Sequence, residues 1–117
     1  PLRVQLEGKR VIIIDDSLVR GTTSKILIDI IRRAGAKEVH FRSASPAVKY
    51  SCFYGLDTAH RDELIAAKMA VDEIRKEINA YTLDYLSMDN MLKSLNCKDY
   101  CVGCFNGIYP MCTPTEE

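Results

Sequence analysis

The sequence lacks a net charge, a long apolar run and a recognisable amino-terminal leader. Lysine plus arginine and aspartate plus glutamate each number 16 in 117 residues, so the formal net charge is zero. Balanced charge gives no overall basic footprint for nucleic acid or an anionic membrane. No segment approaches the roughly 20 apolar residues of a membrane span, and the opening Pro1-Leu2-Arg3 shows no secretory signal. We therefore predict a soluble, cytoplasmic protein without a nucleic-acid or membrane partner.

The length sets a second bound. A chain of 117 residues is enough for one modest domain that buries roughly two thirds of its unfolded surface, and is short for a two-domain enzyme. Its apolar content of 47% and charged content of 27% are ordinary for a globular protein. No internal repeat or low-complexity linker divides it. We expect the body of one domain at 1–96 and a cysteine-rich, metal-binding tail of the same domain at 97–117.

The apolar pattern near the start predicts a strand, a loop, a helix and a second strand. Val11-Ile12-Ile13-Ile14 is a continuous β-branched run, typical of a strand buried on both faces of a parallel sheet. Apolar residues recur every three or four positions over 23–34, which predicts a helix that Gly35 ends. Alternation over 39–43 predicts a second strand and a right-handed β-α-β unit. The fold class is therefore α/β, and we expect the remaining strands of the sheet upstream.

The rest of the chain is predicted to be helical and irregular. Segment 45–57 contains proline and glycine and has no sustained period, so we expect it to leave the sheet without regular structure. Apolar residues over 61–79 predict one helix or two short ones. The tail from 97 onward is rich in cysteine, glycine and proline, and we expect a metal to hold it. A further helix is expected at 88–95, with Ser87 as its N-cap and Met91, Leu92 and Leu95 facing inward.

A polar loop between the first strand and the helix carries the strongest chemical signal. It reads Asp15-Asp16-Ser17-Leu18-Val19-Arg20-Gly21-Thr22-Thr23 and follows the carboxyl end of a parallel strand, where α/β sheets bind ligands. Unpaired N–H groups at the head of a helix favour a phosphate dianion, and the serine and threonine hydroxyls add donors. The two acids can take ribose hydroxyls or a hydrated Mg²⁺. The alternative for a lone acid pair is an ordinary helix cap.

The cysteines form the second signal. Cys101-Val102-Gly103-Cys104 is a Cys-x-x-Cys pair, and Cys52 lies about fifty residues upstream. Two cysteines at that spacing can chelate one metal centre from a single turn, while distant ones complete the shell. An odd total of five cysteines suits a reduced compartment better than paired disulfides. An iron-sulfur centre, a structural zinc and unliganded thiols all stay open, with Cys97 a spare thiol or substitute ligand and Cys112 incidental.

These segments, in this order, resemble the glutamine phosphoribosylpyrophosphate amidotransferases. The loop resembles the fingerprint of type I phosphoribosyltransferases, so the resemblance implies part of such a domain, with a Rossmann-like parallel sheet. It implies an enzyme that transfers glutamine-derived ammonia to phosphoribosyl pyrophosphate, giving 5-phosphoribosylamine in purine biosynthesis. Asp15 and Asp16 would serve Mg²⁺ and the ribose, and 17–23 the 5′-phosphate. The other matching stretches are Cys52-Phe53-Tyr54-Gly55-Leu56-Asp57, Arg61-Asp62-Glu63-Leu64-Ile65-Ala66-Ala67, Tyr85-Leu86-Ser87 and Cys101-Val102-Gly103-Cys104-Phe105-Asn106-Gly107-Ile108-Tyr109-Pro110.

The same resemblance implies cofactors and partners. Cluster-bearing members hold a [4Fe-4S] cluster with cysteines at the positions of Cys52, Cys101 and Cys104, and with one more cysteine upstream. It implies a glutaminase domain outside this chain, a homo-oligomeric parent and a chain that is inactive alone. Tyr50-Ser51-Cys52 stands where the family usually has His-Pro-Cys.

The two histidines carry no catalytic signal. We expect His40 in the sheet and His60 on the surface, neither of them a catalyst. Two rival functions stay open, a non-catalytic module that senses phosphoribosyl pyrophosphate and a zinc-stabilised interaction domain.

Overall fold

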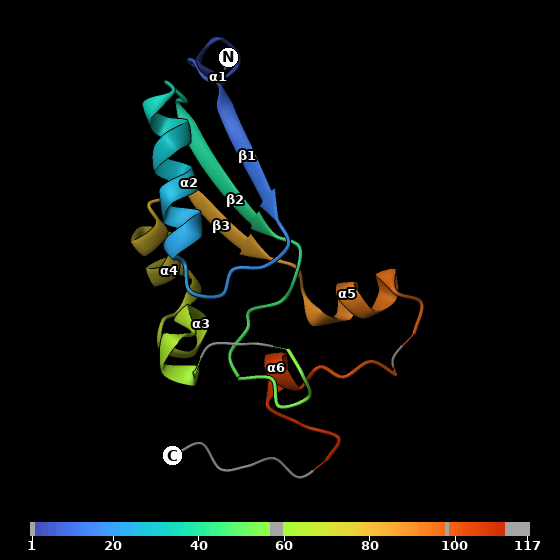
Figure 1. Ribbon diagram of the computed structural model, residues 1–117. Coiled ribbons are helices and arrows are strands. Elements are labelled where there is room, and N and C mark those ends of the chain that lie inside the picture. Colours follow the sequence, from blue (N-terminus) through green and yellow to red (C-terminus); the bar gives the residue numbers. More distant parts are fainter. Residues whose placement is uncertain (1, 57–59, 98, 112–117) are drawn as a thin grey trace.

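Three parallel strands form the centre of the molecule (Figure 1). They are β1 (Arg10–Asp15), β2 (Glu38–Ser43) and β3 (Thr82–Tyr85), in that order across the sheet. The computed structural model describes residues 2–56, 60–97 and 99–111. In the last rung Asp15 pairs with Ser43 and Ser43 with Tyr85. Because the strands run parallel, their carboxyl ends meet at one edge of the sheet.

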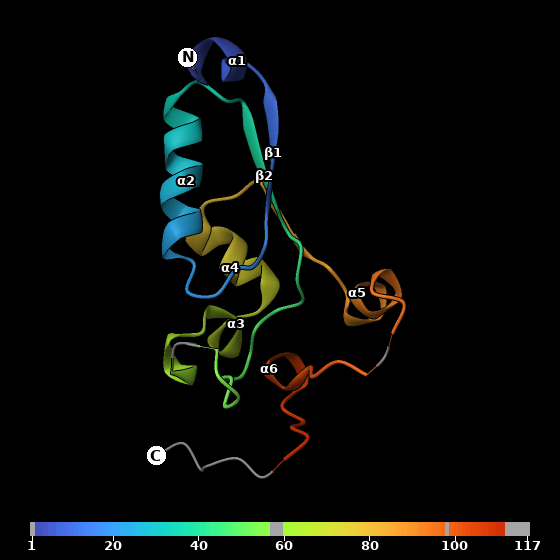
Figure 2. The ribbon, with the colours of Figure 1, turned by 45° about the vertical axis from the view of Figure 1, so that its right-hand side comes forward.

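Of the described helices, two cover the sheet, α1 (Leu2–Leu6) lies at its amino end, and the others lie beyond its carboxyl edge (Figure 1). α2 (Thr22–Arg33) and α4 (Val71–Ile78) lie on one face of the sheet (Figure 2). None of the helices in the described part of the chain is long and apolar enough to cross a membrane. The remaining elements are the 3₁₀ turn η1 (Arg61–Glu63), α3 (Ile65–Lys68), α5 (Met88–Ser94) and α6 (Gly103–Asn106).

The core lies between the sheet and its two covering helices. Alternate side chains of the strands point to this face, and Val39, Phe41 and Leu83 are buried there. Ile28 of α2 and Ile74 of α4 are the buried residues that meet them. A buried aromatic or aliphatic side chain of this kind stabilises a fold by roughly 1.5–3 kcal/mol. This packing fixes the position of α2, whose first turn begins beside the ends of the strands.

The opposite face of the sheet is open. We expected β1 to be buried on both faces, and this is wrong for the described residues, since only Ile13 is buried. Ile12 and Ile14 point to the other face and are 62% and 75% exposed. The physical reason is that α2 and α4 cover the face of Ile13, and no helix in the described ranges covers the other one.

A polar network occupies the rest of that open face. His40 Nδ1 lies 2.6 Å from Thr82 Oγ1, and His40 Nε2 lies 3.0 Å from Glu38 Oε2. Arg42 donates to Thr82 Oγ1 at 2.9 Å and pairs with Asp84 at 3.5 Å. His40 is therefore a sheet residue, as the sequence indicated.

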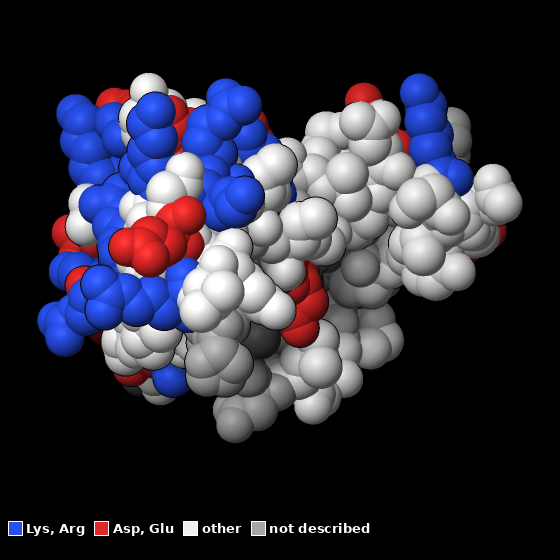
Figure 3. Space-filling view, turned by 90° about the horizontal axis from the view of Figure 1, so that it is seen from above, with Lys and Arg blue, Asp and Glu red and all other residues white. Residues whose placement is uncertain are grey.

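Basic side chains gather at the amino end of the sheet, far from the loop (Figure 3). Lys9, Arg10 and Lys37 are exposed there, and Arg32 and Arg33 form the last turn of α2. Basic residues at a helix carboxyl terminus interact favourably with the helix dipole. The zero net charge of the whole chain therefore conceals a locally basic surface.

Several predicted elements differ from the observed ones. The strand β3, which supplies the third strand of the sheet, was not predicted from the sequence. The segment predicted as one helix or two over 61–79 is divided into η1, α3 and α4. Ser87 does cap α5, since its Oγ accepts the Asn90 N–H at 3.2 Å. The inward position of Leu95 is wrong, because α5 buries no residue and Leu95 is 46% exposed.

Tyr85 yields a testable prediction about stability. Its hydroxyl is buried without a hydrogen-bond partner in the described structure. Because an unpaired buried hydroxyl is unfavourable, we expect Tyr85→Phe to raise the free energy of unfolding by about 1 kcal/mol at neutral pH. Urea denaturation measures this difference. A clear loss of stability in the variant would mean that the hydroxyl has a partner.

The same residue predicts a pH dependence. Burial raises the pKa of Tyr85 from 10.0 to about 12. The unfolded chain therefore loses this proton first, and the stability that is complete below pH 10 decreases between about pH 10 and 12. The Tyr85→Phe variant lacks this contribution, so its stability should decrease less over the same interval in matched denaturation series.

Candidate functional site

The loop after β1 lies at the carboxyl edge of the sheet and leads into α2. Gly21 is the N-cap of α2, with φ 83°, and no side chain caps the helix head. Thr22 and Thr23 are exposed in the first turn. The first N–H groups of a 12-residue helix therefore face outward without a side-chain acceptor, which suits an anionic ligand.

The two acids are fixed by short-range hydrogen bonds. Asp15 Oδ1 accepts the Asp16 N–H at 2.9 Å, and Asp16 Oδ1 accepts the Ser17 N–H at 2.7 Å. Asp16 is exposed and Asp15 half-buried. The turn therefore holds both carboxylates at the edge of the sheet, beside the open helix head.

The middle of the loop is anchored in the protein. Leu18 is 1% exposed and packs in the main core. Val19 packs against a second, smaller core, and its carbonyl accepts the Ile65 N–H at 3.0 Å. Arg20 pairs with Glu63 at 3.1 Å on the surface. The side chains of Leu18 and Val19 thus hold the loop, so a ligand would meet these two residues through their backbone.

A side chain at position 21 would be unfavourable for two reasons. Its φ of 83° lies in the left-handed region, which is unfavourable for residues with a Cβ. A Cβ there would lie 2.8 Å from Ile65 Cδ1 and 3.5 Å from Ile78 Cγ2. The glycine therefore allows α3 and α4 to pack against the head of α2. The sequence pattern assigned Gly21 to ligand approach and gave no sign of Ile65 and Glu63 as partners of the loop.

Cys52, Cys101 and Cys104 form a group of reduced thiols, none of them in a disulfide. Burial raises the pKa of the Cys104 thiol, and the charges of Cys52 and Cys101 raise it further. Cys52 and Cys101 each therefore lie within electrostatic range of Cys104. In the described ranges, however, no three His, Cys, Asp or Glu side chains form a preformed metal cage. The three thiols are suitable ligands for a thiolate-bound metal centre. In the described residues, however, they do not converge on one point.

The two segments that carry these thiols are joined through their backbones. The Cys104 carbonyl accepts the Lys49 N–H at 3.0 Å and the Tyr50 N–H at 3.1 Å. Arg61 donates from Nε to the Lys49 carbonyl at 3.3 Å, and its guanidinium lies 4.7 Å from the centre of the Tyr50 ring. These contacts place α6 beside the segment that leads to Cys52.

A small apolar core connects the thiol segments with the loop after β1. Leu64 is fully buried and packs with Val48. Val19 of the loop and Cys104 and Phe105 of α6 pack against the same pair. The two candidate sites thus share one core, which was not predicted from the sequence.

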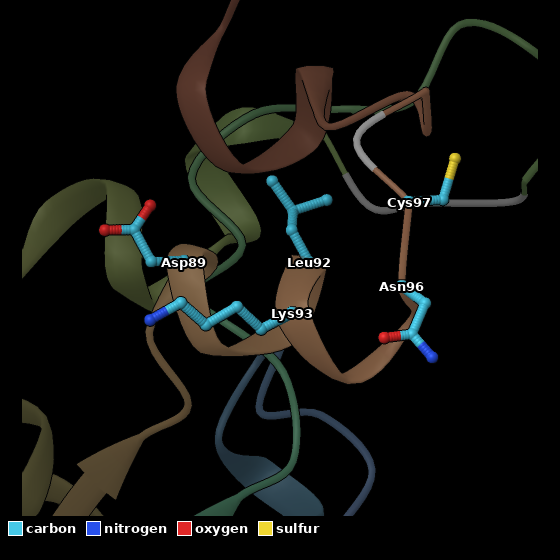
Figure 4. A pocket seen from close by; sticks show the side chains of 5 residues that line it. All are labelled: Asp89, Leu92, Lys93, Asn96 and Cys97. Atoms are coloured by element: carbon cyan, nitrogen blue, oxygen red, sulfur yellow. The ribbon is translucent and has the colours of Figure 1, made fainter.

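The other predicted residues lie apart from these two sites. Cys97 lines a separate hollow of about 450 Å³ with Asp89, Leu92, Lys93 and Asn96 (Figure 4). Cys97 Sγ accepts the Asp99 N–H at 3.3 Å. His60 is exposed, as expected, and Cys112 lies outside the described residues.

Gly21→Ala tests the packing of the loop. We expect it to lower the free energy of unfolding by about 2 kcal/mol or more, because left-handed strain and the clash with Ile65 add. Gly8→Ala is the matched control, since Gly8 has φ 72° and a Cβ on it would meet nothing within 4 Å. Its loss should be about 1 kcal/mol. Adding Ile65→Val to Gly21→Ala should restore part of the difference, and equal losses in both single variants would exclude the clash.

The chain has relatives among the amidophosphoribosyltransferases, although no protein-family model matches it. It is 50% identical over its whole length to amidophosphoribosyltransferase 2 of Arabidopsis thaliana, covering 21% of that protein. It is 48% identical over 99% of its length to the amidophosphoribosyltransferase of Methanothermobacter thermautotrophicus, covering 25%. The Bacillus subtilis enzyme is 47% identical over 93% of the chain, which covers 24% of it.

Solved structures give the same result. A structure of the allosteric regulatory enzyme of purine biosynthesis matches 92% of the chain with a TM-score of 0.85 and 48% identity, over 24% of its own length. The glutamine phosphoribosylpyrophosphate amidotransferase of Bacillus subtilis in complex with ADP and GMP matches 92% of the chain with a TM-score of 0.85 and 47% identity, over 25% of its length. The chain spans about a quarter of the relatives it matches. Over that span it is a homologue of the amidophosphoribosyltransferases, with the α/β fold of their phosphoribosyltransferase domain.

Proposed function

We propose that the chain forms the phosphoribosyl pyrophosphate site of an amidophosphoribosyltransferase. One observation carries the proposal, namely the uncapped head of α2 beside two fixed carboxylates at the carboxyl edge of the sheet. The names of the relatives support the same activity. We assign 1–96 to the body of this domain and 97–117 to its cysteine-rich tail.

The loop accounts for how such a substrate is held. The N–H groups of Gly21, Thr22 and Thr23 bind the 5′-phosphate, since donors at a helix head favour a dianion. Asp15 and Asp16 accept hydrogen bonds from the ribose hydroxyls. Both carboxylates are also suitable oxygen ligands for Mg²⁺, which would neutralise charge on the pyrophosphate. Leu18 and Val19 keep the loop rigid, so the ribose is positioned before reaction.

The reaction then needs little proton chemistry from this chain. Ammonia forms a C–N bond at C1 of the ribose, the bond from C1 to the pyrophosphate oxygen breaks, and pyrophosphate leaves with the bonding pair. The resulting ammonium loses one proton to give 5-phosphoribosylamine. The carboxylates of Asp15 and Asp16 stabilise the positive charge on the ring, and the Mg²⁺ that they would hold would offset the negative charge on the leaving group. No histidine in the described residues lies in the loop, which agrees with this scheme.

Other parts of the enzyme lie outside this chain in the proposal. Ammonia comes from glutamine, hydrolysed by a glutaminase domain that these residues do not contain. We propose that the chain alone is inactive and that the full-length protein is a homo-oligomer. The cytoplasmic location stays a prediction.

We further propose that Cys52, Cys101 and Cys104 ligate a [4Fe-4S] cluster. The support is the thiol chemistry of the three residues and the backbone hydrogen bonds that join the segment before Cys52 to Cys104. The fourth ligand would come from residues other than these three. A module that only senses phosphoribosyl pyrophosphate has no need of such a thiol group, so the thiols favour the enzyme over the sensor.

Two substitutions test the loop. Asp16→Asn and Thr22→Ala should each weaken phosphoribosyl pyrophosphate binding by the full-length protein by about 1–3 kcal/mol, because each removes a hydrogen-bonding group from the site. Titration calorimetry in the presence of Mg²⁺ measures the affinity. Asp29→Asn is the matched control, because Asp29 lies near the far end of α2 and forms its ion pair with Arg33 of the same helix. Unchanged affinity in both loop variants would show that the loop is not part of the binding site.

Metal analysis tests the thiol assignment. Protein purified without oxygen should contain iron and sulfide near four per full-length chain, as a [4Fe-4S] cluster requires. A stoichiometric zinc content would instead indicate a structural zinc site, and it would favour the zinc-stabilised interaction domain over the enzyme. Cys101→Ser should abolish the iron content, whereas Cys97→Ser, in the separate hollow, should leave it unchanged.

A further inference from the structure

Tyr109 connects the two segments that carry the candidate cysteine ligands. Its hydroxyl donates to the Ser51 carbonyl at 2.6 Å. Ser51 is 7% exposed and directly precedes Cys52. A short hydrogen bond to a buried carbonyl is well suited to fix the backbone at that point.

The ring of Tyr109 also fixes the second segment. A Cβ on Gly103 would lie 2.5 Å from Tyr109 Cδ1 and 2.7 Å from Cε1. Gly103 is buried and lies inside the Cys-x-x-Cys pair, next to Cys104. The absence of a side chain therefore lets the ring lie directly against the backbone between Cys101 and Cys104.

Aromatic neighbours hold the ring in this place. Phe53 and Tyr54, which directly follow Cys52, meet the Tyr109 ring edge-on with centroid distances of 5.2 and 6.1 Å. One tyrosine–glycine contact does join the two segments, because a Cβ on Gly107 would lie 2.9 Å from Cζ of Tyr50. Tyr109 thus packs on a glycine of its own segment, whereas Tyr50 packs on a glycine of the other segment.

We propose that Tyr109 is a positioning residue for the thiol site. By bonding beside Cys52 and packing beside Cys104, it sets the separation of these ligands before a centre assembles. Residues that orient metal ligands from outside the ligand shell commonly affect affinity tenfold or more. This inference rests on the proposed cluster, since it concerns the same three thiols.

The test compares Tyr109→Phe with wild type in the full-length protein. The variant keeps the ring and loses only the hydroxyl that reaches Ser51. Tyr54→Phe is the matched control, since the Tyr54 hydroxyl belongs to the same aromatic group but bonds the Met111 backbone, at 3.1 Å. Circular dichroism and thermal unfolding of all three proteins confirm that they are folded. Gly103→Ala, which displaces the ring while keeping its hydroxyl, is the second variant.

Two readouts distinguish the spacing of the thiols from the presence and stability of the iron-sulfur cluster. In chelator-treated protein, dibromobimane becomes fluorescent when it bridges two nearby thiols, so its yield reports their separation. In anaerobic protein, iron and sulfide are assayed, and the visible absorbance is followed on exposure to air. We expect Tyr109→Phe and Gly103→Ala to bridge less and to lose the absorbance about tenfold faster than wild type. Tyr54→Phe should behave as wild type.

Three outcomes would contradict the proposal. Bridging and bleaching rates equal to wild type in Tyr109→Phe would remove its positioning role and leave the cluster assignment intact. An equal loss in Tyr54→Phe would show that the effect is not specific to the hydroxyl that bonds Ser51. A wild type without iron and sulfide would overturn the cluster assignment together with the role of Tyr109 in it.

Discussion

The burial of Leu64 is the contact on which both candidate sites depend. Leu64 and Val48 form a small core, and Val19 of the loop after β1 and Cys104 and Phe105 of α6 pack against it. The polar edges of the loop and the thiols cannot hold themselves in place, because exposed ion pairs such as Arg20 with Glu63 contribute little. Removing a fully buried leucine typically costs about 2–5 kcal/mol. Such a loss here would loosen both segments, since each has an apolar residue on the same small surface.

A backbone hydrogen bond next to this core joins the start of α3 to the loop. Ile65 follows Leu64, donates its N–H to the Val19 carbonyl and fills the space that Gly21 leaves open. The segment from η1 to α3 therefore packs against the loop from the side opposite the strands. This explains why the loop tolerates polar residues at 15–17 and 22–23 yet places Leu18 and Val19 inside. Because Leu18 and Val19 hold the loop in place, the N–H groups at the head of α2 stay available to a ligand.

The sequence predicted the local chemistry better than the arrangement in space. The strand, loop and helix from Arg10 to Arg33 follow from apolar periodicity, and Gly21 and the acids fall where they were expected. β3 was missed because four residues, Thr82 to Tyr85, give too short an alternation to detect. The exposure of Ile12 and Ile14 could not be read from composition, since burial depends on what covers a face. The shared core at Leu64 joins residues far apart in the chain, and no local period encodes such a contact. The same holds for Tyr109 and Ser51.

The departure from the family pattern before Cys52 shows which contacts are independent of side-chain identity. Tyr50 stands where the family that the sequence resembles usually has histidine, and its ring contacts both Arg61 and Gly107. Ser51 stands where proline is usual, yet Tyr109 bonds the carbonyl of this residue, which any amino acid provides. The Lys49 and Tyr50 N–H groups that bond Cys104 are likewise backbone groups, and residue 51, where proline would remove an N–H, is not among these donors. The backbone cross-links around the thiols therefore do not depend on the side chains at positions 50 and 51, whereas the contact of the Tyr50 ring with Gly107 does depend on that side chain.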